Sequence, residues 1–162
     1  MDVKMAEPVS EKEFLERMNE AMPPEMQLSE ARAIDDRHPA LTASLKAAEY
    51  QIRILDGENR QRLFRAVPAM MEQDAVMAVR KTKSGLKDTD IKPLILSLKE
   101  EGDSLFACLV LTEREACKPN MLISALKKAA GLEEETEIRT MVIRTGLLGA
   151  GPDGNLIPLE RV

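Results

Sequence analysis

Histidine and aromatic residues are almost absent from this chain of 162 residues. It has no Trp, one Tyr, three Phe and a single His. Because histidine is the commonest general base and the commonest metal ligand, this composition excludes catalysis or metal binding built on several histidines. A platform that stacks nucleic-acid bases on several aromatic rings is excluded as well. The one histidine, His38, precedes a proline in a polar turn, where we expect a surface position.

Cysteine is also scarce, with two residues at positions 108 and 117. Two cysteines make neither a disulfide framework nor a zinc motif at this spacing. Cys108 lies in an apolar run and is expected to be a small buried hydrophobe. Cys117 precedes a predicted helix, where a thiol pKa can fall, but a reactive role is the less favoured interpretation. We predict no metal and no cofactor.

Long apolar runs are missing too, so no membrane span is expected. The N-terminus lacks the basic and apolar regions of a signal peptide, and we therefore predict a cytoplasmic protein. The formal net charge of −5 argues against a general nucleic-acid coat. Basic clusters within the chain are still compatible with that balance.

The pattern of apolar residues predicts an α+β fold. From about residue 46 we interpret the order of elements as a ferredoxin-like β-α-β-β-α-β unit. Pro93 indicates an edge strand or a bulge within its strand, and Pro119 marks the start of a helix that Gly131 ends. The expected strands are Tyr50–Ile54, Ala75–Lys81, Ile91–Leu98, Leu105–Leu111 and Ile138–Ile143, and the first helix is Asn59–Gln73.

The first third of the chain reads as half of a second such unit. Strands are expected over Met1–Met5 and Met26–Ile34, and a capping box at Ser10 to Glu13 starts a helix between them. We assign 1–37 to this truncated β-α-β half, 38–46 to a linker, 47–148 to the ferredoxin-like domain and 149–162 to a C-terminal turn and tail. Because only half of the motif is present, we expect either that sequence is missing upstream or that another chain completes the sheet. In the second case the protein would be a homo-oligomer.

The densest polar feature is the basic loop Arg80–Lys92. Its five basic and two acidic residues give it a charge of +3 in a chain of −5. Its hydroxyls and backbone amides suit phosphate oxygens, although it is not a P-loop. The alternative is an ordinary solvated hairpin loop. The candidate anion- or RNA-binding residues here are Arg80, Lys81, Lys83, Lys87 and Lys92.

A second basic set consists of Arg53 in the predicted first strand and Arg60, Arg62 and Arg65 on the predicted helix that follows. Arg62 and Arg65 share one helix face at a spacing of three, and they complete the candidate binding residues. Arginine binds phosphate in a bidentate manner, but arginines on a helix face are more often only solvated. No acid–base pair is evident, so we expect no catalytic residue.

The stretch RKTKSGLKDTDIKPLI at Arg80–Ile95 resembles the radical SAM-linked domain of unknown function of bacteria. AEPVSEKEFLERMNEAMPP at Ala6–Pro24 and AAEYQIRI at Ala47–Ile54 agree with it in register, and Gly149–Glu160 also fits. Members of that family carry a further N-terminal segment with distinctive polar residues, which this sequence lacks. The Cys-x-x-x-Cys-x-x-Cys motif of radical SAM enzymes is absent as well, so no iron–sulfur cluster or SAM site is expected here.

The resemblance implies a bacterial accessory domain that acts with a radical SAM partner, fused or encoded separately. Our leading hypothesis is a non-catalytic module that presents the basic loop to RNA or another anionic substrate of that partner. A second hypothesis is a protein-interaction module that docks on the radical SAM protein without contacting nucleic acid. A third, less favoured, is an RNA-processing enzyme in its own right.

Overall fold

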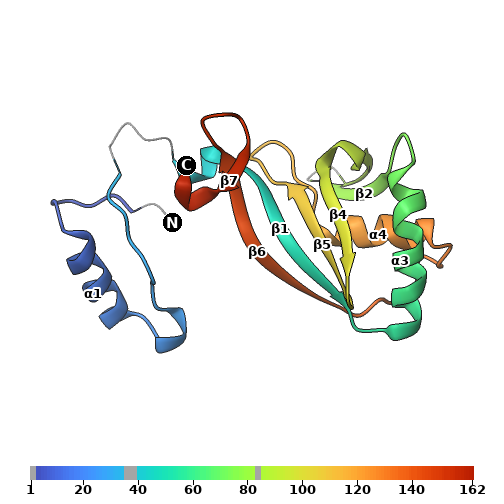
Figure 1. Cartoon of the computed structure of the whole chain (residues 1–162), viewed down its shortest axis with the longest axis horizontal. Coiled ribbons are helices and arrows are strands. Elements are labelled where there is room, and N and C mark those ends of the chain that lie inside the picture. Colours follow the sequence, from blue (N-terminus) through green and yellow to red (C-terminus); the bar gives the residue numbers. More distant parts are fainter. Residues whose placement is uncertain (1–2, 35–39, 83–84) are drawn as a thin grey trace. The chain divides into compact units, whose positions relative to one another are not determined.

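The computed structural model describes residues 3–34, 40–82 and 85–162. The chain divides into two compact units, Met1–Leu41 and Thr42–Val162 (Figure 1).

Helix α1 (Glu11–Ala21) is the main element of the first unit. Ser10 caps it as predicted, accepting a hydrogen bond from the Glu13 amide at 3.2 Å. The Asn19 side chain then binds the backbone of Leu28 twice, at 2.7 and 3.0 Å, and so fastens the returning chain to the helix. None of residues 3–34 is buried, and the apolar side of α1 is only partly shielded from solvent. The unit is therefore held by hydrogen bonds more than by a core.

The strands predicted for this first unit are wrong within the described residues. Residues 3–5 have no regular structure, and the segment after α1 forms a 3-10 turn at Pro24–Met26 followed by irregular chain to residue 34. Alternating apolar residues form a strand only where another strand accepts their backbone hydrogen bonds. The β-α-β half unit is thus replaced by a single capped helix with extended flanks.

The second unit is built on an antiparallel sheet with the strand order β4-β5-β1-β6-β7 (Figure 1). Helix α3 lies on the connection from β1 to β4, and α4 lies on the connection from β5 to β6; each connection skips one strand. These two split β-α-β connections confirm the predicted α+β class. The bounds are α2 Leu41–Ser44, β1 Leu45–Ile54, α3 Gly57–Met71, β4 Ile95–Glu101, β5 Ser104–Val110, α4 Pro119–Ala129, β6 Thr140–Ala150 and β7 Leu156–Pro158.

The two helices cover one face of this sheet. Ile52 and Ile54 alternate with exposed Arg53 along β1, and their side chains join those of Leu63 on α3 and Leu122 on α4 in the core. Alternation along a strand places every second residue on one face, so the opposite face carries the polar residues of β1. Pro119 begins α4 as predicted.

Several boundaries differ from the sequence prediction: β1 begins at Leu45 and not at Tyr50, and β6 runs to Ala150 and not to Ile143. Pro93 lies in a 3-10 turn (Lys92–Leu94), so β4 begins at Ile95 and not at Ile91. β4 is an edge strand, and its register against β5 shifts between Ile95 and Ser97, as Pro93 had indicated. The segment 149–162, expected as a turn and tail, adds the short fifth strand β7.

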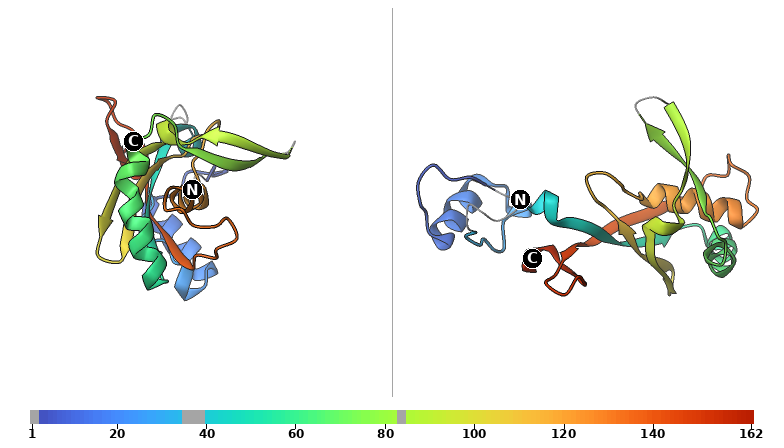
Figure 2. Two further views of the ribbon diagram at one scale, coloured as in Figure 1. Left: turned by 90° about the vertical axis from the view of Figure 1, so that its right-hand side faces the viewer. Right: turned by 90° about the horizontal axis from the view of Figure 1, so that it is seen from above.

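A separate hairpin is inserted between α3 and β4. Strands β2 (Met77–Thr82) and β3 (Gly85–Asp90) pair only with each other among the described residues, and both views of Figure 2 show them projecting from the body of the second unit. The sequence predicted β2 but treated 83–90 as loop, which is wrong for 85–90. We call residues 77–90 the arm.

Within the described ranges, no helix combines the length and the apolar character needed to cross a membrane.

Candidate functional site

Arg80 and Lys87 are direct cross-strand neighbours on the arm. Directly opposed residues of an antiparallel pair extend from the same face with their Cβ atoms about 5 Å apart. Arg80 is half-buried and Lys87 is exposed. Neither side chain forms a salt bridge with an acidic residue among the described residues. Like charges in this position are destabilising. The arm thus concentrates positive charge at a cost to its own stability.

The base of the arm is fixed by the carboxylate of Asp90. Its Oδ1 accepts hydrogen bonds from the backbone amides of Val76 at 2.8 Å and Lys92 at 2.9 Å. The amide of Ile91 also donates to the carbonyl of Val76 at 2.8 Å. One side chain therefore joins the start of β2 to the end of β3.

Lys92, a predicted binding residue, has a structural contact instead. Its Nζ donates a hydrogen bond to the carbonyl of Met71, the last residue of α3. A cation at this position satisfies a carbonyl that has no partner within the helix and complements the helix dipole. Lys92 consequently belongs to the base of the arm and is not grouped with Arg80 and Lys87.

Arg62 is also engaged within the fold. Its guanidinium reaches the carbonyls of Ala130 and Gly131, both at 3.4 Å, where α4 ends. Arg65 is exposed on the same helix. Among the described residues, no hydrogen bond or ion pair joins Arg62 or Arg65 to the arm, which begins beyond the C-terminal end of α3. Lys81 lies in β2 opposite Leu86, and Lys83 is outside the described residues.

The other face of the arm carries three exposed apolar side chains beside the carboxylates of Asp88 and Asp90, a grouping that the sequence did not reveal. Met77, Val79 and Leu86 share this face by strand alternation, and their exposed fractions are 43%, 45% and 76%. The alternation of Met77 and Val79 was the available signal, but Leu86 was masked by its basic neighbours. One face of the arm therefore carries the pair of Arg80 and Lys87, and the other carries exposed apolar side chains among charged ones.

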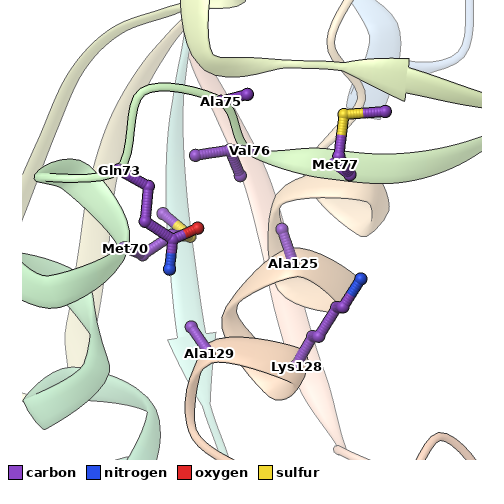
Figure 3. A pocket seen from close by; sticks show the side chains of 8 residues that line it. All are labelled: Met70, Gln73, Ala75, Val76, Met77, Ala125, Lys128 and Ala129. Carbon is purple, nitrogen blue, oxygen red and sulfur yellow. The ribbon is translucent and has the colours of Figure 1, made fainter.

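A groove of about 340 Å³ lies where the arm leaves the domain (Figure 3). Met70 and Gln73 from the end of α3, Val76 and Met77 at the start of the arm, and α4 form its walls. Lys128 of α4 adds an exposed cation at its rim. The lining includes no acidic residue and no nucleophile, so the groove offers space and one positive charge.

The cysteines show no sign of activation. Burial raises the pKa of the Cys117 thiol to about 11, and burial together with the nearby charge of Glu49 raises that of Cys108. Cys117 is therefore the buried, inert thiol favoured by the sequence analysis. Cys108 is half-buried, less so than predicted. Among the described residues, no group of three or more His, Cys, Asp and Glu is placed to hold a metal ion.

The comparisons with known proteins give a family and nothing narrower. No curated protein and no solved structure was found to match the chain. The family described as "Uncharacterized protein conserved in bacteria (DUF2344)" matches residues 1–128, a span that includes α1, the arm and nearly all of α4. Its description assigns no catalytic activity. Since the match covers well over half of the sequence, this chain belongs to the bacterial family DUF2344.

Proposed function

We propose that this protein is an accessory module whose arm binds the phosphate backbone of RNA, the substrate of a radical SAM partner enzyme. The observation that carries the proposal is the cross-strand pair of Arg80 and Lys87. Opposed cations repel each other in the free protein, and an anion placed between them would relieve that repulsion.

The shape of the arm supports the same function. A two-stranded ribbon that projects from a domain can lie along a nucleic-acid backbone, and side chains that contact phosphate position a protein without reading sequence. Lys128 lies at the groove beside the base of the arm and would extend the basic surface toward α4. The scarcity of aromatic residues agrees with backbone contact in place of base stacking.

The partner is proposed from the resemblance of Arg80–Ile95, Ala6–Pro24 and Ala47–Ile54 to the radical SAM-linked domain. In this arrangement the partner performs the chemistry, and this chain holds the substrate. The thiol of Cys117, protonated at neutral pH, contributes no nucleophile of its own.

The test is fluorescence anisotropy with a labelled single-stranded RNA, measured at several salt concentrations. We expect log Kobs to fall linearly with log salt for the wild type. The variant Arg80→Ala/Lys87→Ala should bind about 10-fold more weakly or worse, with the slope reduced by about 2. Its matched control is Lys46→Ala/Lys99→Ala, which removes two exposed cations from β1 and β4 and should keep the wild-type slope.

Two outcomes would contradict RNA binding by the arm. One is binding that does not depend on salt, since phosphate contacts release counterions. The other is an equal loss in the two double variants, which would indicate a response to net charge alone. Asp88→Asn supplies an independent check, because removing the acidic side chain opposite Val79 should strengthen binding.

The exposed apolar side chains of the arm favour a second candidate function, docking on the partner protein without nucleic-acid contact. Exposed apolar side chains that cluster on a projecting element are typical of protein–protein contacts. Val79→Asp/Leu86→Asp should then abolish co-purification with the radical SAM protein. Under this alternative, Arg80→Ala/Lys87→Ala would leave co-purification intact.

A further inference from the structure

The outer edge of β6 is unpaired along most of its length in the part of the chain that the structure describes. β7 pairs only with Leu148, Gly149 and Ala150, whereas β1 pairs with β6 from Thr140 onward. The segment Thr140–Gly146 therefore has a neighbour on one side only. A free strand edge presents a row of backbone donors and acceptors to any other strand.

Three consecutive apolar residues of this edge are exposed. Met141, Val142 and Ile143 have exposed fractions of 47%, 42% and 46%. Because successive residues point to opposite faces of a sheet, apolar surface is exposed on both faces of this edge. A strand added here would gain backbone hydrogen bonds and apolar contacts on both sides.

The opposite edge of the same sheet is protected. β4 has a register shift next to Leu96, and its last three residues, Lys99, Glu100 and Glu101, are charged and exposed. Bulges and charged residues are the usual means by which edge strands avoid pairing with other chains. The stretch of β6 from Met141 to Ile143 has neither, whereas the exposed Arg144 and a register shift against β1 between Arg144 and Gly146 follow it directly. The unprotected part of this edge is therefore the stretch 140–143.

The charges along β6 are compatible with pairing to itself. In a two-fold antiparallel pairing centred on Val142, Arg144 lies opposite Thr140 of the other copy and Arg139 lies opposite Thr145. Centring the pair on Ile143 places Arg144 opposite Val142. No register centred on the apolar residues therefore brings two like charges together, which would be destabilising. The edge is self-complementary, as an isologous interface requires.

We propose that two copies of this chain associate through antiparallel pairing of their β6 edges, joining their sheets into one continuous sheet. Backbone hydrogen bonds would supply the attraction, and the apolar residues 141–143 of each copy would cover one another. This interface is independent of the arm and of RNA.

The test is sedimentation velocity of the full chain over about a hundredfold range of protein concentration, since dimerisation depends on protomer concentration. We expect a dimer that dissociates on dilution. Ile143→Lys, or Met141→Lys on the same edge, should weaken association by about 10-fold or more, because lysine protects an edge strand. Leu96→Lys is the matched control, since Leu96 is 48% exposed on the opposite edge.

Circular dichroism would establish that each variant keeps the wild-type fold. A wild-type chain that stays monomeric at the highest concentration would overturn the proposal. So would a dimer that survives both β6 variants, or one that Leu96→Lys disrupts instead. Single cysteines at positions 141, 142 and 143 give a second measurement. On oxidation, we expect at least one of these cysteines to form a disulfide with the same cysteine of a second copy of the chain, while Leu96→Cys stays monomeric. Disulfide formation in Leu96→Cys alone would overturn the proposal.

Discussion

Arg53 on β1 and Asp103 in the turn between β4 and β5 form an ion pair, with 2.5 Å between Nε and Oδ2. The pair continues into a chain of hydrogen bonds on the sheet face away from the helices. Ser104 donates to Asp103 at 3.0 Å, and Gln51 donates to Ser104 at 3.2 Å. Mainly through the hydrogen bond from Arg53, and then through that from Ser104, these contacts lower the pKa of Asp103 below its ordinary value of 3.8.

This ion pair predicts a loss of stability in acid. Because the folded-state pKa of Asp103 is depressed, its contribution is present above pH 3.8 and is lost as the pH falls through the lower folded-state value. Asp103→Asn should lower the urea midpoint at neutral pH, and the difference from wild type should vanish in strong acid. Asp153→Asn, in an exposed turn, is the control and should show no such pH-dependent difference. A difference in urea midpoint between Asp103→Asn and wild type that persists unchanged into strong acid would refute a stabilising effect of the ionised carboxylate.

Asp90 should be the most sensitive polar residue of the arm. Asp90→Ala leaves the backbone amides of Val76 and Lys92 without their acceptor, and each lost bond of this kind costs about 1–3 kcal/mol when the donor is shielded from water. We expect a decrease of that order in the free energy of unfolding from urea titration. Asp88→Ala, on the exposed part of β3, should change stability by less than about 0.5 kcal/mol. Equal effects of the two variants would rule out a special function of Asp90 at the base.

Arg62 and Arg65 lie three residues apart on α3 but should respond differently. Arg62→Ala removes the contact with the carbonyls at the end of α4 and should cost about 0.3–1 kcal/mol of stability. Arg65→Ala should be nearly neutral, because its exposed side chain makes no such contact with the rest of the fold among the described residues. Neither variant should change the salt slope of RNA binding. A reduced slope in either would place α3 within the RNA-binding surface.

The Cys117 thiol should be nearly unreactive in the folded protein. With a pKa of about 11 and a buried side chain, it should react with iodoacetamide far more slowly at pH 8 than in urea. Because the folded-state pKa lies above the ordinary 9.0, the protonated thiol favours folding below pH 9, and that contribution declines between pH 9 and about 11. Mass spectrometry of the labelled protein would separate Cys117 from the half-buried Cys108. Rapid native labelling of Cys117 would contradict this prediction.

Most helices and strands of the second unit could be predicted from short stretches of sequence, because each such stretch favours one structure for a local physical reason. Pro119 begins α4 since a proline needs no hydrogen bond at the first helical position. The apolar run near Leu105 predicted β5 to within a residue. In the first unit, the alternation of apolar and polar residues at Met26–Ile34 predicted a strand that does not form. A strand needs a partner strand, and the sequence does not reveal whether one is present. β3 was missed because its residues are too polar to resemble a strand.

The candidate site was only partly accessible to sequence reasoning. Basic residues near Arg80 could be grouped, but the pairing of Arg80 with Lys87 depends on hairpin register. The contacts of Lys92 with Met71 and of Arg62 with the end of α4 join positions 21 and 68 residues apart. Such contacts require the tertiary fold, so sequence spacing grouped those cations with Arg80 and Lys87 without revealing their contacts within the fold.

The arm contributes no strand to the main sheet, and Asp90 joins its two ends. Its length and tip can consequently change while the register of β4 on β5 stays as it is. Under the proposed function, ligand preference and folding would then be encoded in different residues of one chain. A relative with a shorter or recharged hairpin could acquire a new ligand without rebuilding the domain that holds it.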